Sequence, residues 1–89
     1  MANFKRAEMR FIDEIFEMGG GYVLDFSNKT FAEFFEDDFG IVIYQDKYAT
    51  RGTSKANHLR TFLEKEDGHV VGKVLRRLWE YREDGRHVG

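Results

Sequence analysis

Two serines are the side chains that could serve as catalytic nucleophiles, because the chain contains no cysteine. Ser27 and Ser54 each stand where a helix is predicted to begin. A serine hydroxyl at that position accepts a hydrogen bond from a backbone N–H group that has no partner inside the helix. Helix capping therefore explains both serines better than catalysis does. We predict no catalytic residue, and we expect that the protein is not an enzyme.

Three histidines are the next candidates for chemistry, because imidazole is a common metal ligand. They lie 11 and 18 residues apart and form no H-x-x-x-H or H-x-E pattern. Metal sites usually combine ligands at such short spacings, and thiolate ligands are absent here. We interpret His58, His69 and His87 as polar residues on helix surfaces, and we predict no metal site and no cofactor.

Basic and hydroxyl residues follow a glycine turn in the segment RGTSK, residues 51–55. Free N–H groups and the helix dipole favour an anion at a helix start. The order of residues is not that of a phosphate-binding Walker A loop. The candidate anion site also includes basic residues of the third and fourth predicted helices. Its members are Arg51, Gly52, Thr53, Ser54, Lys55, Arg60, Lys73, Arg76 and Arg77. A plain helix cap and a solvated basic face remain the alternatives.

A run of carboxylates forms a candidate acidic interaction patch that consists of Glu33, Glu36, Asp37 and Asp38. Asp37 and Asp38 fall near the C-terminal end of a predicted helix, where the dipole disfavours negative charge by about 0.3–1 kcal/mol each. Either an arginine later in the chain offsets this cost, or the acids meet a basic partner. The arginines that could do so are Arg76, Arg77 and Arg82.

The size and composition of the chain limit it to one domain. It has 89 residues, of which 42% are hydrophobic, and it contains 9 Phe, 4 Tyr and 1 Trp for a compact core. No apolar run approaches the ~20 residues that span a bilayer, and we expect no membrane association. The absence of cysteine and of a secretory signal pattern favours a cytoplasmic protein.

Charge is distributed unevenly along the chain. Residues 1–50 hold five basic and ten acidic groups, whereas residues 51–89 hold nine basic and six acidic groups. The two halves are therefore complementary in charge. Either they attract each other within one domain, or they form two surface poles for different partners.

Apolar residues recur every three to four positions in four segments, which predicts four amphipathic helices. The first runs from Phe4 to Met18 with Asn3 as its cap and stops at the glycines of residues 19–21. Ser27 or Asn28 caps the second, which runs to about Asp38 before Gly40. Thr53 or Ser54 caps the third, to about Lys65, and Asp67 caps the fourth. Residues 22–26 and 41–44 are predicted extended connectors, with a minimal two-stranded pairing as an option.

The predicted fold is all-α, a compact four-helix domain over residues 1–83 with a frayed tail over residues 84–89. A ridge of four phenylalanines on the second helix faces the core: Phe31, Phe34, Phe35 and Phe39. On the fourth helix, Trp79 belongs to the apolar stripe. Gly72 within that helix suggests that a neighbouring helix crosses closely there.

Three stretches of the chain also show a resemblance to a known group of proteins: MGGGYVLDFSNKTFAEFF (18–35), YATRGTSKANHLRTFL (48–63) and LWEYRE (78–83). Together they resemble a small helical module at the N-terminus of uncharacterised bacterial proteins, some of which are similar to abortive-infection or other anti-phage defence proteins. The segment IVIYQDKY (41–48) departs from the more acidic connector of that module. The resemblance implies an adaptor or sensing module, with Gly52, Ser54, Lys55 and Arg60 as its conspicuous positions.

These observations together favour a non-enzymatic module that binds another protein, with homodimerisation as a close variant. The exposed remainder of the phenylalanine ridge would form the apolar centre of the interface, and the charged poles would steer the encounter. One alternative is binding of nucleic acid or a nucleotide phosphate through the basic residues. Another is a small inhibitor that mimics nucleic acid through the acidic patch.

Overall fold

The protein is an all-helical domain in the computed structural model, which describes residues 3–88 and the side chains of residues 3–84. This confirms the predicted fold class. The described residues contain no strand, so the two extended segments do not pair and serve only as connectors. The elements in chain order are α1 (Arg6–Ile15), η1 (Gly19–Gly21), α2 (Asn28–Phe39), η2 (Asp46–Tyr48), α3 (Lys55–Lys65) and α4 (Gly68–Val88), where η denotes a short 3-10 helix.

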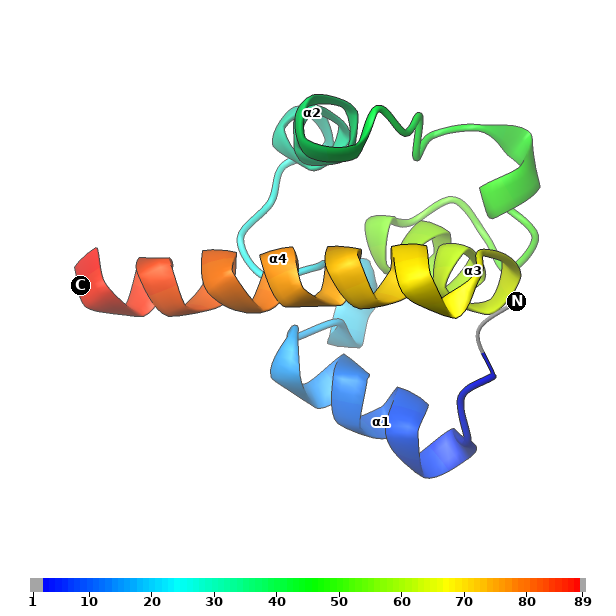
Figure 1. The fold of residues 1–89 in the computed structure, drawn as a ribbon, viewed down its shortest axis with the longest axis horizontal. Coiled ribbons are helices and arrows are strands. Elements are labelled where there is room, and N and C mark those ends of the chain that lie inside the picture. Colours follow the sequence, from blue (N-terminus) through cyan, green and yellow to red (C-terminus); the bar gives the residue numbers. More distant parts are fainter. Residues whose placement is uncertain (1–2, 89) are drawn as a thin grey trace.

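Helix α4 is the axis around which the other helices are arranged. Figure 1 shows α2 on one side of α4 and α1 on the opposite side, with α3 behind the N-terminal half of α4. The C-terminal turns of α4 extend beyond the other helices (Figure 1). The backbone is helical through Val88, so residues 84–88 of the predicted tail continue this helix. Gly89 lies outside the described residues.

Helices α2, α3 and α4 begin at the capping residues that local sequence signals predict. The Ser27 hydroxyl accepts a hydrogen bond from the Thr30 N–H group at 3.1 Å, and the Ser54 hydroxyl accepts one from the Asn57 N–H group at 3.1 Å. At the start of α4, one carboxylate oxygen of Asp67 accepts from the N–H groups of His69 and Val70. Each cap satisfies donors that the helix itself leaves without a partner.

Helix α1 is shorter than predicted at both ends. It begins at Arg6 with Lys5 as its cap, because the Glu8 carboxylate accepts the Lys5 N–H group at 2.8 Å; Asn3 is not the cap. It ends at Ile15, before the glycines, with Glu17 at a φ of 52°. This early exit places Met18 in the core, where it is fully buried. Burial of a long apolar side chain therefore ends the helix before the glycines can.

Aromatic rings from three elements meet at the centre of the fold. Phe35 of α2 lies 5.3 Å from Phe62 of α3, and Phe62 lies 5.4 Å from Tyr48 of η2, measured between ring centroids. Edge-on contacts of this kind add about 0.5–1.5 kcal/mol each to the burial of the rings. Of the predicted ridge, Phe31 and Phe35 are fully buried and the other two phenylalanines are half-buried.

The connectors supply a share of the core that helical periodicity does not reveal. Val23, Ile43 and Tyr48 are buried, although none of them belongs to an α-helix. Each comes from a segment that crosses the apolar faces of the helices. Both connectors and the short helix η2 therefore each contribute a side chain to the packed interior.

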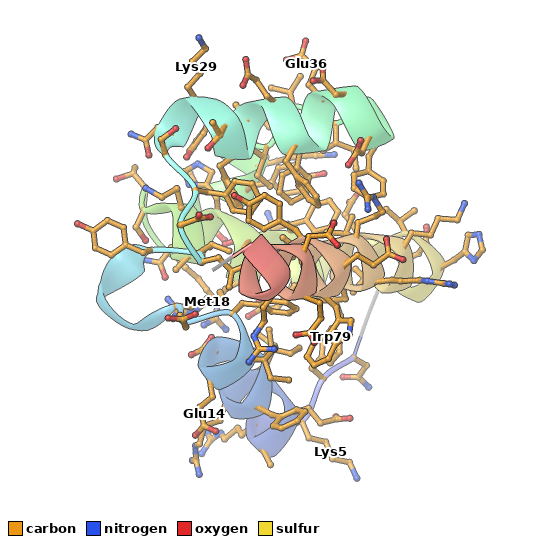
Figure 2. The ribbon with its side chains drawn as sticks, turned by 90° about the vertical axis from the view of Figure 1, so that its left-hand side faces the viewer. Lys5, Glu14, Met18, Lys29, Glu36 and Trp79 are labelled. Atoms are coloured by element: carbon orange, nitrogen blue, oxygen red, sulfur yellow. The ribbon has the colours of Figure 1, made fainter. Side chains whose placement is uncertain are left out.

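Two predictions for α4 and one for α3 are wrong. Trp79 is exposed at 45% and lies on the side of α4 toward α1, where its ring faces the Arg82 guanidinium at 5.1 Å (Figure 2). No neighbouring atom lies within 4 Å of a Cβ built on Gly72, so no helix crosses there. His58 is not on the surface but buried; its Nδ1 lies 3.0 Å from the Ser54 carbonyl oxygen and its ring meets the Tyr44 ring edge-on.

In the described part of the chain, no helix combines the length and the apolar character that crossing a membrane requires.

Candidate functional site

An open cleft of about 650 Å³ lies between α1, the N-terminal segment before it, and α3 with its preceding loop. Its volume falls in the range of ligand-binding pockets, roughly 300–1,000 Å³. The lining contains four arginines and two carboxylates, so its ionised groups leave a net positive charge. The lining residues are Asn3, Phe4, Arg6, Met9, Arg10, Asp13, Arg51, Arg60 and Glu64.

Arg60 is the most tightly held of the four arginines. Its Nε and Nη2 atoms donate to the two carboxylate oxygens of Asp13 at 3.3 and 3.2 Å. Its Nη1 atom donates to the Asn57 side-chain oxygen at 2.9 Å, and Nη2 also reaches the Met18 carbonyl oxygen at 3.4 Å. A two-pronged arginine–carboxylate contact fixes both partners in orientation. Arg60 is therefore a rigid part of the cleft wall.

Arg51 is also paired within the cleft. It forms an ion pair with Glu64, and both side chains are about half exposed, at 50% and 45%. Glu64 follows Arg60 by four residues on α3, so the two lie on the same face of that helix. Together the pairs Arg51–Glu64 and Arg60–Asp13 neutralise two of the four positive charges of the cleft.

Arg6 and Arg10 carry the remaining positive charge. Both are exposed, and within the described part of the chain neither makes an ion pair or a hydrogen bond through its side chain. They are four residues apart on α1, so they project from the same face one turn apart. Like charges at this spacing destabilise a helix by a few tenths of a kcal/mol. The unpaired charge is the feature of the cleft that an anionic partner would satisfy.

The predicted anion site at the start of α3 is not assembled as one group. Arg51 and Arg60 line the cleft, whereas the Lys55 ammonium donates to the Asn28 side-chain oxygen at 3.1 Å and lies 5.1 Å from the Tyr22 ring centroid. The Ser54 hydroxyl caps α3, as the alternative interpretation had it. The two other predicted members, Gly52 and Thr53, do not line the cleft.

The predicted basic residues of α4 lie apart from the cleft. Lys73 and Arg76 are exposed, and Arg76 pairs with Glu80 at 3.7 Å. Arg77 pairs with Glu80 at 2.8 Å and with Asp38 of α2 at 3.2 Å. The hydrogen bond from Arg77 holds the pKa of Glu80 below its ordinary value. These arginines are engaged within the fold, which leaves Lys73 as the unpaired cation of this group among the described residues.

The acidic patch divides into one paired and three unpaired carboxylates. Asp38 pairs with Arg77, so an arginine of α4 offsets its unfavourable place near the end of α2. Glu33, Glu36 and Asp37 are exposed and have no ion pair within the described residues. Figure 2 shows Glu36 directed away from the body of the protein, on the side opposite to Lys5 and Glu14 of the α1 region.

Sequence reasoning missed the α1 half of the cleft. In the sequence, the solvated face of an ordinary amphipathic helix accounts for Arg6, Arg10 and Asp13. They come close to Arg60 only because α1 and α3 border the same cleft. The usable signal was the pair of arginines at a repulsive spacing, which a helix avoids unless something else favours it.

The described residues contain no group of three or more potential metal ligands placed to hold an ion. What the arrangement offers chemically is recognition of negative charge beside two apolar side chains, Phe4 and Met9.

No protein-family model, curated protein or solved structure matches this chain.

Proposed function

We propose that this protein is a non-enzymatic module that binds a protein partner, and that the cleft between α1 and α3 is its binding site. The observation that supports this proposal is that Arg6 and Arg10 have no partner among residues 3–84, whereas the two arginines beside them are already held in place. Arginine is enriched at protein interfaces and among the residues that dominate binding energy. Phe4 and Met9 supply an apolar surface in the same cleft.

The resemblance described above supports an adaptor or sensing role in bacterial phage defence, in the cytoplasm. Of the four positions that it makes conspicuous, Arg60 lines the cleft. Homodimerisation through a phenylalanine ridge has less support, because its rings are buried or half-buried. The exposed large apolar side chains come from four separate segments instead: Phe11, Tyr22, Val42 and Trp79.

Binding of nucleic acid or a nucleotide phosphate is the second candidate, since the same unpaired arginines also suit phosphate. Two features weigh against it. Asp13 and Glu64 line the cleft beside the arginines, and the whole chain has a formal charge of −2. Phosphate-driven binding would weaken steeply with salt, whereas a protein contact with an apolar component would depend on salt less.

Site-specific photocrosslinking distinguishes these candidates. A photoreactive phenylalanine analogue replaces Phe4 in the cleft, and the matched control places the same analogue at exposed Tyr22, outside the cleft. After irradiation in cells that naturally make the chain, the proposal expects a defined polypeptide adduct at Phe4 that is absent at Tyr22. Nucleic-acid adducts at Phe4 would favour the second candidate. No adduct specific to Phe4 would overturn the cleft as the site that binds a partner in the cell.

A further inference from the structure

We infer that the partner enters the arginine-lined cleft with an acidic segment that presents two acidic residues spaced about 6 Å apart along its backbone. This inference rests on the proposed function, because it takes the cleft as the binding site, and it names the chemistry of the occupant. Three observations support it: the spacing of Arg6 and Arg10, the ion pairs that Arg51 and Arg60 already make, and the apolar side chains that line the cleft.

The spacing follows from α1 itself. Arg6 and Arg10 are separated by four residues of α-helix, which corresponds to about 6 Å along the axis. Two acidic residues four apart on a partner helix have the same separation, and alternate residues of an extended segment come close to it at about 6.6–6.8 Å. Each arginine can then take one carboxylate through two parallel N–H groups.

The number of carboxylates follows from the pairing inside the cleft. The guanidinium group of Arg60 already contacts Asp13, Asn57 and Met18, and Arg51 already has Glu64. Only Arg6 and Arg10 lack a partner within the described residues, so the free charge is two. A ligand with two negative charges matches it, whereas a longer run of phosphates would also meet the carboxylates of Asp13 and Glu64.

The apolar lining adds a second requirement. Phe4 is half-buried and Met9 is half-buried, and both border the same cleft as the arginines. Methionine adapts its flexible thioether chain to irregular surfaces. We therefore expect the acidic segment to place an apolar side chain next to its carboxylates, which would keep part of the affinity when salt screens the charges.

A second copy of this chain is a less suitable occupant than a different protein. Glu33 and Asp37 of α2 have the required four-residue spacing, but α2 and α1 lie on opposite sides of α4 (Figure 2). A contact from α2 of one copy to α1 of the next would be head-to-tail and would propagate into open chains unless its rotation closed a ring. The structure therefore favours an acidic segment supplied by another protein.

Selection from a random displayed peptide library tests the ligand class. The library is selected on the unmodified protein and counter-selected on Arg6→Glu/Arg10→Glu. Because both arginines are exposed and have no partner in the part of the chain that the structure describes, this variant should fold, and circular dichroism checks that it does. The matched control is Lys29→Glu/Lys73→Glu, which makes the same charge change at two exposed lysines outside the cleft.

The inference expects enrichment of peptides with two acidic residues spaced i,i+4 or i,i+2 and an adjacent apolar residue. A selected peptide should bind Arg6→Glu/Arg10→Glu at least tenfold more weakly, and Lys29→Glu/Lys73→Glu within about twofold of the unmodified protein. Peptides without acidic pairs, or equal losses in both variants, would overturn the inference.

Two further measurements separate this inference from its competitors. The first is a competition measurement, in which a single-stranded oligonucleotide and the unlabelled peptide each displace the labelled selected peptide. If the oligonucleotide does so at the lower concentration, the acidic peptide is overturned as the ligand. The second is self-association. If the protein associates with itself in a concentration-dependent way and Glu33→Lys/Asp37→Lys abolishes this, the occupant is a second copy instead.

The failure of this inference can be distinguished from the failure of the proposed function. Protein adducts at Phe4 combined with non-acidic selected peptides would refute the acidic ligand and leave the cleft as the binding site. Acidic peptides that bind while Phe4 gives no cellular adduct would support the ligand class and refute the cellular role.

Discussion

Arg60 of α3 donates two hydrogen bonds to the carboxylate of Asp13 of α1, from Nε at 3.3 Å and from Nη2 at 3.2 Å. The two residues are 47 positions apart in the sequence. This contact joins the acidic half of the chain to the basic half. It also sets the cleft wall, because the same guanidinium reaches the Met18 carbonyl oxygen, where the chain leaves α1. The attraction between halves that the charge distribution suggested therefore occurs at this partly buried pair and at the pair Arg77–Asp38.

Replacing Asp13 with alanine should lower the free energy of unfolding by about 1–2 kcal/mol, because Arg60 loses a charged hydrogen-bond partner and keeps its partly buried place. Urea denaturation measures the change. Glu14→Ala is the matched control, since Glu14 is an exposed carboxylate on the same helix with no described partner. Equal midpoints for the two variants would mean that the pair contributes nothing to stability.

Replacing Gly72 with alanine should raise the free energy of unfolding by about 0.5–1 kcal/mol. Glycine inside a helix costs about this much relative to alanine. The added Cβ meets no neighbouring atom within 4 Å, so no clash offsets the gain. Thermal unfolding checks this, and a lower midpoint would contradict the open space around this position.

Replacing Gly52 with alanine should instead lower the free energy of unfolding. Gly52 has a φ of 139°, which side chains rarely adopt, and a Cβ there would lie 2.7 Å from the Asn57 side-chain nitrogen. Asn57 in turn accepts a hydrogen bond from Arg60. We expect Gly52→Ala to lower the melting temperature, with Gly72→Ala as the reference. A neutral result would contradict the strained geometry of this turn.

The raised pKa of Tyr81 indicates that the protein loses stability at high pH. Its hydroxyl donates to the Asp25 carboxylate at 2.6 Å, and burial together with Asp25 raises the pKa of Tyr81 to about 12 from an ordinary value of 10.0. The folded state therefore holds this proton more tightly than the unfolded state does. The stabilisation is complete below about pH 10 and is lost as the pH rises toward 12.

Tyr81→Phe should flatten the decline of the free energy of unfolding between pH 10 and 12, measured by urea denaturation at several pH values. Part of the decline should persist, because burial also raises the pKa of Tyr44 and of Tyr48. An unchanged slope in the variant would show that the Tyr81 proton is not linked to folding.

Local signals were sufficient for most of the helices. The caps at Ser27, Ser54 and Asp67 and the stop at Gly40 are determined within one or two turns of chain, because a helix end needs only a nearby acceptor or a residue that tolerates positive φ. For the same reason, the fold class followed from apolar spacing alone. These features would be predicted equally well in a different tertiary context.

Long-range packing decided the remainder. The end of α1 moved because Met18 is buried, and the core takes Val23 and Ile43 from the connectors whereas Trp79 of α4 is exposed. Such outcomes depend on which surfaces dock, and periodicity along one helix carries no information about that.

By itself the sequence determined four helices, the caps of three of them and a division of charge between two halves. The tertiary structure decided which charges meet. Arg60 and Asp13 neutralise each other only because α3 lies beside α1, and within the described residues that same docking leaves Arg6 and Arg10 without a partner. The physical reason is that ion pairing depends on distance in space, and distances between residues far apart in the chain are set by the packing of the apolar faces.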